Sequence, residues 1–186
     1  MKKSILITIL LMICFFVNGQ NLIKPEKGFT NDIGNLVSML NDLKARVTRS
    51  VEGMSQYEAD YLLDDNANRI GAMIMHLAAT EAYYQVYTFE NRGFNKDEQK
   101  KWSVALNLGD NGREKLQGKP IEYYLDIYKE VRAKTLKLLK TKDDKWLKEK
   151  NSAGTMNNHW AWYHVMEHQA NHMGQIRFLA KRIPKE

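Results

Sequence analysis

The chain has 186 residues, and its 28 lysines and arginines outnumber its 22 aspartates and glutamates, so its formal net charge is +6. With 44% hydrophobic and 27% charged residues and only three prolines (Pro 3), the composition excludes a disordered or collagen-like chain. A single cysteine excludes a disulfide scaffold, and the length favours one domain.

Residues 1–19 have the layout of a secretory signal peptide. Lys2 and Lys3 precede an apolar run over 5–17, and Val17-Asn18-Gly19 offers small residues where a signal peptidase cleaves. The run is shorter than the roughly 20 apolar residues of a membrane span, although a retained anchor is the alternative. Cleavage removes Cys14 and two lysines, which leaves a net charge of +4. We therefore expect an exported, periplasmic or extracellular protein without a stable membrane anchor after cleavage.

The rest of the chain is predicted to be helical, because proline is scarce and alternating β-branched residues are few. Apolar residues spaced by three and four predict an amphipathic helix over 31–54. A second helix, over 67–91, is apolar on nearly all sides and is therefore expected to be buried. His76 and Glu81 are conspicuous because they are polar residues inside it.

Two further long helices are predicted in the second half. The connection over 92–119 is too long to be structureless, so a short helix is expected near 97–104. Pro120 is a favoured first residue for the third long helix, and the fourth is predicted over 156–181. Four long helices in one domain predict an all-α four-helix bundle.

Four of the five histidines lie in the fourth predicted helix. His164, His168 and His172 span only about 80° of its circumference, on the face expected to enter the core. A buried imidazole without a partner costs about 1–3 kcal/mol. A divalent metal bound by two of these histidines and by His76 satisfies them and keeps positions open for water or substrate. The alternative is a set of core histidines bonded to one another, to nearby tyrosines or to water.

Two carboxylates are candidates for acid–base chemistry. His164 to His168 matches H-x-x-E-H, the inverted zinc-protease signature, with Glu167 as the base. However, Glu167 lies about 100° from His168 around the helix, and no downstream acidic ligand helix is visible. Glu81 is a candidate because a carboxylate in a buried helix has a perturbed pKa. A buried pair with a lysine, arginine or tyrosine is the favoured alternative for Glu81.

The segment HWAWYHVMEHQANHMGQIRFLAKRIP (159–184), together with MIMHLAATEAYY (73–84), resembles the DinB-like family of four-helix-bundle proteins over about residues 30–184. The resemblance implies an up-down-down-up bundle with a long crossover between its second and third helices. It also implies a divalent metal, most often Zn or Ni, bound by His76, His168 and His172.

The remaining polar residues of this face are then expected to lie around the metal ligands. His164 becomes a residue of the pocket or of the surroundings of the ligands, as does Glu81. Gln175 lies on the histidine face and is expected to bond a ligand imidazole or a bound water.

The better understood relatives act as metal-dependent thiol transferases or isomerases. We therefore expect an exported, metal-dependent hydrolase or transferase that acts on a small-molecule substrate of unknown identity. The alternative is a non-catalytic, metal-stabilised binding or dimerisation module, and a homodimer is compatible with both. No run of five like charges and no motif that reads DNA or RNA is visible, so no nucleic-acid partner is expected.

Overall fold

The structure is a computed structural model that describes residues 22–151 and 154–185. The predicted signal peptide lies outside these residues. The described part of the chain forms eight helices and no strand, which confirms the all-α class. None of its helices combines the length and the apolar character needed to cross a membrane.

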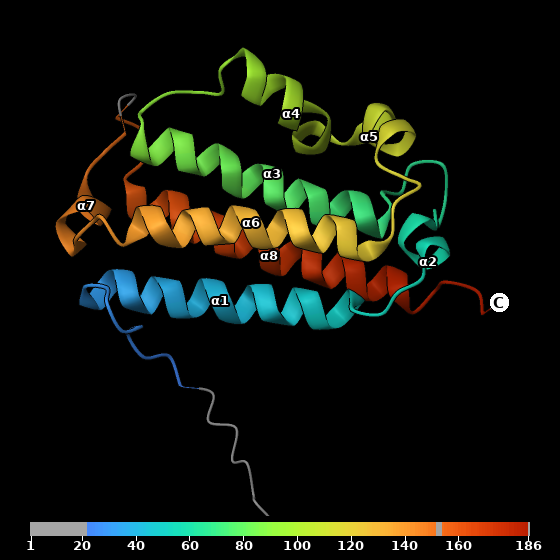
Figure 1. Ribbon diagram of the computed structural model, residues 1–186, viewed down its shortest axis with the longest axis horizontal. Helices are drawn as coiled ribbons and strands as arrows, with labels where there is room; N and C mark the ends of the chain where they lie inside the picture. The colour runs from blue at the N-terminus through green and yellow to red at the C-terminus, as the bar shows by residue number, and fades with distance from the viewer. Residues whose placement is uncertain (1–21, 152–153, 186) are drawn as a thin grey trace, which may run out of the picture.

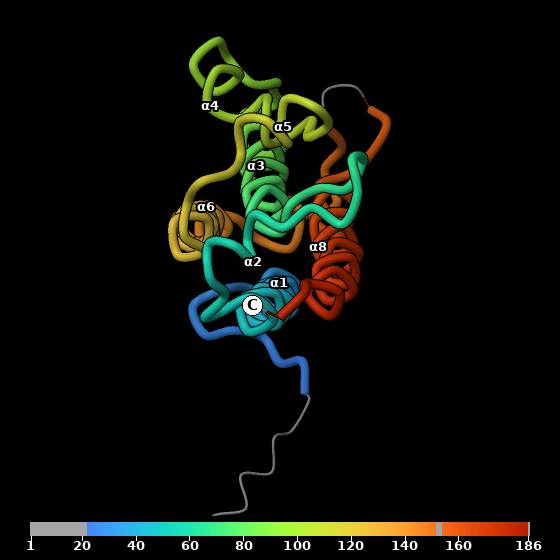
Figure 2. The backbone as a smooth tube through the Cα atoms, turned by 90° about the vertical axis from the view of Figure 1, so that its right-hand side faces the viewer, coloured from blue at the N-terminus to red at the C-terminus, as the bar shows by residue number. Residues whose placement is uncertain are grey.

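Four long helices run side by side along the molecule (Figure 1). They are α1 (Asn31–Val51), α3 (Ile70–Phe89), α6 (Ile121–Leu139) and α8 (Asn158–Ala180). Seen end-on, α3 lies opposite α1, and α6 lies opposite α8 (Figure 2). Helices α1 and α8 run in one direction, and α3 and α6 in the other (Figure 1). Each predicted long helix therefore exists, with ends that are shorter by a few residues.

Four short helices fill the connections: α2 (Gln56–Asp60), α4 (Lys96–Asn107), α5 (Gly109–Lys115) and α7 (Asp144–Lys148). Helix α4 is the short helix expected near 97–104, whereas α2, α5 and α7 were not predicted. Helices α4 and α5 are consecutive in the chain. Both lie over α3 in the crossover between α3 and α6 (Figures 1 and 2). Capping boxes begin α2 at Ser55 and α4 at Asn95, because each of these side chains accepts from the third residue of its helix.

The long helices pack through apolar side chains. Helix α3 contacts both α6 and α8, and α1 contacts α8 and α6. Gly71 permits the close approach of α3 and α6, since a Cβ atom built there would lie 2.6 Å from Cε2 of Tyr124. Near the other end, Trp146 of α7 stacks on Phe89, with ring centroids 4.7 Å apart, and closes the core.

One buried polar network joins all four long helices. Glu81 of α3 accepts two hydrogen bonds from Arg132 of α6, at 2.7 and 2.9 Å. Thr135 donates to the same carboxylate at 2.6 Å, and Gln169 of α8 donates at 3.2 Å. Arg132 also donates to the backbone carbonyl of Leu40 in α1, at 2.5 Å. Because a buried charge needs a specific partner, this network sets how the helices are aligned.

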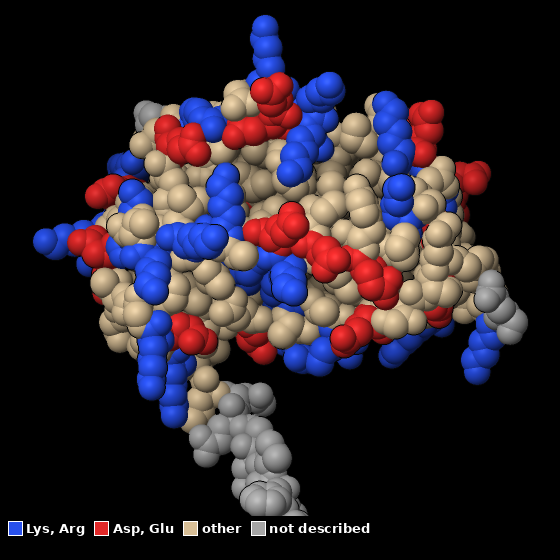
Figure 3. All heavy atoms as spheres, in the orientation of Figure 1, with Lys and Arg blue, Asp and Glu red and all other residues tan. Residues whose placement is uncertain are grey.

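The surface carries charges of both signs. On the face shown in Figure 3, acidic and basic side chains intermix rather than form a field of one sign. The positive net charge of the chain is therefore not concentrated on this face.

Candidate metal centre

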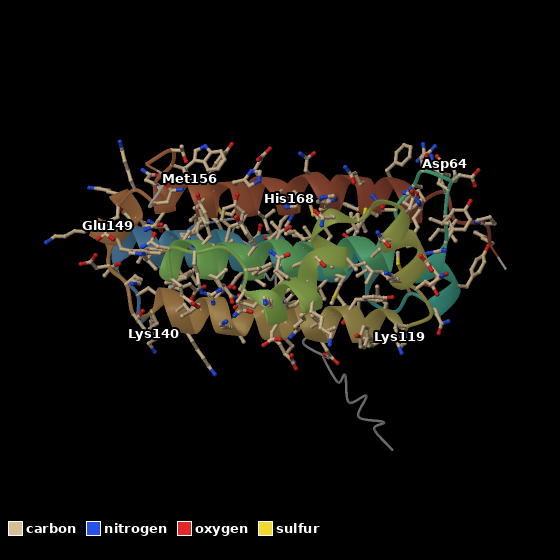
Figure 4. All side chains as sticks on the ribbon, turned by 90° about the horizontal axis from the view of Figure 1, so that it is seen from above. Asp64, Lys119, Lys140, Glu149, Met156 and His168 are labelled. Atoms are coloured by element: carbon tan, nitrogen blue, oxygen red, sulfur yellow. The ribbon has the colours of Figure 1, made fainter. Side chains whose placement is uncertain are left out.

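Three histidines from two helices converge between α3 and α8. His168 and His172 lie one turn apart on α8, and Figure 4 shows His168 halfway along that helix. His76 comes from α3. The Nε2 atom of His168 lies 3.0 Å from that of His76 and 2.9 Å from that of His172. One ring nitrogen from each of the three histidines lies within 4.8 Å of the other two, so the cluster has the composition and spacing to hold a metal ion.

Hydrogen bonds on the far side of two rings orient them toward the cluster. The Nδ1 atom of His76 donates to the backbone carbonyl of Ala105, at 2.8 Å. The Nδ1 atom of His172 lies 3.0 Å from Oε1 of Gln175, which accepts its proton. A neutral ring that donates from Nδ1 carries a lone pair on Nε2. Both Nε2 lone pairs therefore point into the centre, as metal-ligating histidines require.

The convergence of three Nε2 atoms is unfavourable without a cation. A proton on one of them bridges a single pair, and the lone pairs of His76 and His172 then compete for it. Nitrogens bound to one divalent metal at about 2.0–2.1 Å lie about 3 Å apart, which is close to the separations found here. The donor set therefore fits a divalent metal.

The three rings are uncharged at neutral pH. Burial, followed by the neighbouring histidines, lowers the pKa of His168 from its ordinary value of 6.5 to about 3. Burial and the proximity of His76 lower the pKa of His172 to about 4. Burial also lowers the pKa of His76, although hydrogen bonding to backbone carbonyls opposes this shift. Neutral imidazole is the form that binds metals, so the environment keeps the ligands ready at pH 7.

His164 lies beside the cluster but outside it. Its ring is parallel to that of His168, with centroids 5.7 Å apart, and to that of the exposed Trp160, at 5.3 Å. Its Nδ1 atom donates to Oε2 of Glu167, at 3.1 Å. Glu167 is thus paired with a half-exposed histidine. The H-x-x-E-H interpretation needs His164 as a ligand, whereas the three clustered histidines are His76, His168 and His172.

Glu81 belongs to the buried network of the core rather than to this centre. Its carboxylate is fully buried, and the hydrogen bonds it accepts come from Arg132, Thr135 and Gln169. The structure therefore places Glu81 away from the clustered histidines, among these core partners. The alternative of a buried ion pair describes it, because Arg132 supplies the counter-charge.

A cavity of about 560 Å³ lies toward the C-terminal end of α8, and none of the three histidines lines it. Gln175 lines it and also holds His172, so one side chain links the cavity to the cluster. Three more carboxamides border it, from Asn66, Asn68 and Asn171, beside apolar walls such as Phe178. Among the described residues, no ionisable side chain lines this cavity. Oδ1 of Asn68 is buried and has no partner in this part of the chain.

Sequence reasoning found the clustered histidines and Gln175 but missed the Ala105 carbonyl and the asparagines. A backbone carbonyl carries no residue-type signal. The asparagines lie on a connector and on the outer side of the histidine turn, where asparagine is ordinary.

The comparison with known protein families matches residues 35–183 to the family described as mycothiol-S-transferase, MST. Among curated proteins, none matches the chain. The family match spans well over half of the chain and includes both helices that supply the histidines. The family belongs to the DinB-like superfamily, in agreement with the resemblance seen in the sequence. The chain is therefore a member of the mycothiol-S-transferase family of DinB-like proteins.

Proposed function

We propose that this protein is a metal-dependent transferase that joins a small thiol to an electrophilic substrate. The observation that carries the proposal is the convergence of three uncharged histidine nitrogens beside an uncharged cavity. The family name supports a thiol as one substrate. We further propose that the four long helices form the up-down-down-up bundle of DinB-like proteins, with 92–119 as its crossover, and that the metal is Zn or Ni.

The residues divide the work between holding the metal and binding the substrate. His76, His168 and His172 hold the metal, and Gln175 keeps His172 in the required tautomer. When bound, a divalent metal lowers the pKa of a coordinated thiol or water and so supplies a nucleophile at neutral pH. The carboxamides of the cavity bind hydrogen-bonding groups of the substrate, while its apolar walls contact the apolar parts of the substrate.

His164 is the proton acceptor in this proposal. Because its Nδ1 atom donates to Glu167, its Nε2 atom is free to accept a proton. The thiol proton passes to His164, the sulfur forms a bond to a carbon of the second substrate, and the bond to the leaving group breaks with its electron pair. If water replaces the thiol, the same residues support hydrolysis.

Metal content and thiol transfer test the proposal together. The full chain is purified without a histidine tag, and bound metal is measured by mass spectrometry for the wild type, His168→Ala and His159→Ala. His159 is exposed on the same helix and lies outside the cluster, so its variant is the matched control. We expect divalent metal in the wild type and in His159→Ala, and its loss in His168→Ala.

Transfer is then measured with a panel of thiols that includes mycothiol and with a chloro-nitroaromatic acceptor. Activity that follows metal occupancy across the three proteins supports the proposal. Equal metal content in His168→Ala and the wild type contradicts the site. Bound metal without transfer or hydrolysis contradicts the enzyme and favours the non-catalytic binding module.

We also propose that the protein is exported after cleavage near Gly19, that it has no nucleic-acid partner, and that it forms a homodimer. The basic and apolar N-terminal pattern supports export. Mass spectrometry of the N-terminus tests cleavage, and light scattering of the purified chain tests the dimer. An intact N-terminus on cytoplasmic protein, or a monomer at all concentrations, contradicts the corresponding part.

A further inference from the structure

The crossover contains an abrupt break between α4 and α5. Leu108 has φ 54° and ψ −128°, and Gly109 follows with φ 63°. A positive φ is ordinary for glycine but costly for leucine, whose Cβ atom crowds the backbone. Leu108 is one of two non-glycine residues with positive φ among the described residues. Such a conformation persists only where the surrounding structure enforces it.

The break interrupts the helical bonding of the last carbonyls of α4, and the carbonyl of Ala105 is the one that bonds to His76. In a continuous helix the N–H of residue 109 would donate to the carbonyl of Ala105. The last regular bond of α4 instead runs from the N–H of Leu108 to Val104, at 2.9 Å. No backbone N–H in the described part of the chain donates to Ala105. Its carbonyl accepts the Nδ1 proton of His76 in place of that N–H, at 2.8 Å.

Contacts on both sides hold the break in place. On the α4 side, Trp102 is buried against the core. On the α5 side, Arg113 donates to the backbone carbonyl of Asn66, at 3.1 Å, and its own carbonyl accepts from Nε of Arg69, at 3.4 Å. The two helices are thus anchored separately on the molecule, and these contacts stabilise the break between them.

We propose that the break at Leu108 and Gly109 positions His76 for metal binding. Because the N–H of residue 109 does not donate to the Ala105 carbonyl, this carbonyl is free to accept the Nδ1 proton of His76. That hydrogen bond fixes the tautomer and the direction of the His76 ring. The Nε2 atom of His76 then faces those of His168 and His172. Leu108 is a positioning residue, since it acts through Ala105 and touches neither metal nor substrate. The inference rests on the proposed metal site but concerns a ring orientation that exists before any metal binds.

The test removes the break without touching the ligands. The double variant Leu108→Ala/Gly109→Ala favours one continuous helix, in which the N–H of residue 109 competes with His76 for the carbonyl. The matched control is Gly118→Ala. Gly118 also has a positive φ, 74°, in the same crossover, and a Cβ atom at either glycine meets nothing within 4 Å. Both variants therefore carry comparable local strain, and only the first one acts on Ala105.

Zn²⁺ affinity is measured by competition with a chromophoric chelator, in the full chain. We expect the double variant to bind Zn²⁺ about 10–100-fold more weakly than the wild type, which is the usual effect of losing a partner behind a ligating histidine. The Zn²⁺ affinity of the Gly118→Ala control should stay within about twofold of that of the wild type, because His76 keeps the Ala105 carbonyl as its acceptor. Equal affinities in the double variant and the control, together with a gain in helicity by circular dichroism, overturn the proposal.

A second measurement needs no variant and no metal. Nitrogen NMR of the histidine rings in the metal-free wild type should show His76 protonated at Nδ1, and the double variant should show a mixture of tautomers. Protonation of His76 at Nε2 in the wild type overturns the positioning role even if metal binds. Conversely, a wild type that binds no metal but keeps the Nδ1 tautomer refutes the proposed function, while the role of the break in orienting the His76 ring stands.

Discussion

Replacing Glu81 or Arg132 alone by leucine should destabilise the protein strongly, whereas replacing both should cost little. The two side chains are 0% and 4% exposed, and they share two hydrogen bonds at 2.7 and 2.9 Å. Removing one partner leaves a buried charge, for which the loss of stability is about 3–5 kcal/mol. Removing both eliminates the charges and the cost of desolvating them.

The structure predicts which single variant is worse. In Glu81→Leu, the guanidinium of Arg132 keeps only the carbonyl of Leu40 as an acceptor among the contacts described above. Burial lowers the pKa of Arg132 and Glu81 raises it, so without Glu81 the buried cation loses its main compensation. In Arg132→Leu, Thr135 and Gln169 still donate to the carboxylate, so the buried anion keeps two of its hydrogen bonds. We expect about 5 kcal/mol for the first variant and about 3 kcal/mol for the second.

Urea unfolding followed by circular dichroism, at pH 7 with a chelator, measures these free energies. The double variant should lie within about 2 kcal/mol of the wild type, which gives a coupling energy of at least about 6 kcal/mol. For a domain of this size, the single variants should melt about 6–20 °C lower than the wild type. Single variants that cost less than about 1 kcal/mol, or a double variant that costs the sum of the two, would refute the reasoning.

Three further predictions concern the histidines, a helix contact and a helix end. The pKa values of His168 and His172 lie near 3 and 4 in the folded protein, below 6.5, so the unfolded chain takes up protons first as pH falls. The melting temperature of the metal-free protein should therefore fall as pH drops from about 6.5 toward 4 and should be flat above 7. An identical pH profile in a His168→Gln/His172→Gln variant would contradict this cause. Gly71→Ala places a Cβ atom 2.6 Å from Tyr124 and should cost about 1–3 kcal/mol in urea unfolding, whereas Gly174→Ala, where a Cβ atom meets nothing within 4 Å, should not destabilise the helix. Asp144→Ala removes the carboxylate that accepts hydrogen bonds from Thr30 and from the first N–H groups of α1. Hydrogen exchange at the start of α1 should accelerate as expected for the loss of a cap worth about 1 kcal/mol. Unchanged exchange there would show that Asp144 does not cap α1.

Much of the fold was predictable because it depends on periodicity along the chain. The spacing of apolar residues located all four long helices, and glycines with long polar connections placed the breaks between them. Helix α5 was missed because its sequence, GDNGREK, is polar and has two glycines, so neither its pattern nor its composition indicates a helix. It forms where Arg113 anchors it to the connector before α3, which is a contact distant in sequence.

The candidate site was predictable only in its ligands. Residues four apart on one helix must lie on one face, so the proximity of His168 and His172 followed from helix geometry. His76 was predicted as the third ligand because it is a polar residue in an apolar helix and because the family resemblance implies it. For Glu81, five residues further along the same helix, a buried ion pair was the favoured interpretation, but the partner was not predictable because Arg132 lies 51 residues away.

The sequence by itself determined the helical class, the number of long helices and the identity of the histidines, because these features depend on short-range spacing. Only the tertiary structure decided how the histidines are used. It brings α3 beside α8, separates the charge of Glu81 from the centre, and places the Ala105 carbonyl behind His76 by breaking the crossover at Leu108. The reason is physical: helix periodicity is set by bonds between neighbours, whereas metal geometry and buried hydrogen bonds depend on contacts between residues distant in the chain.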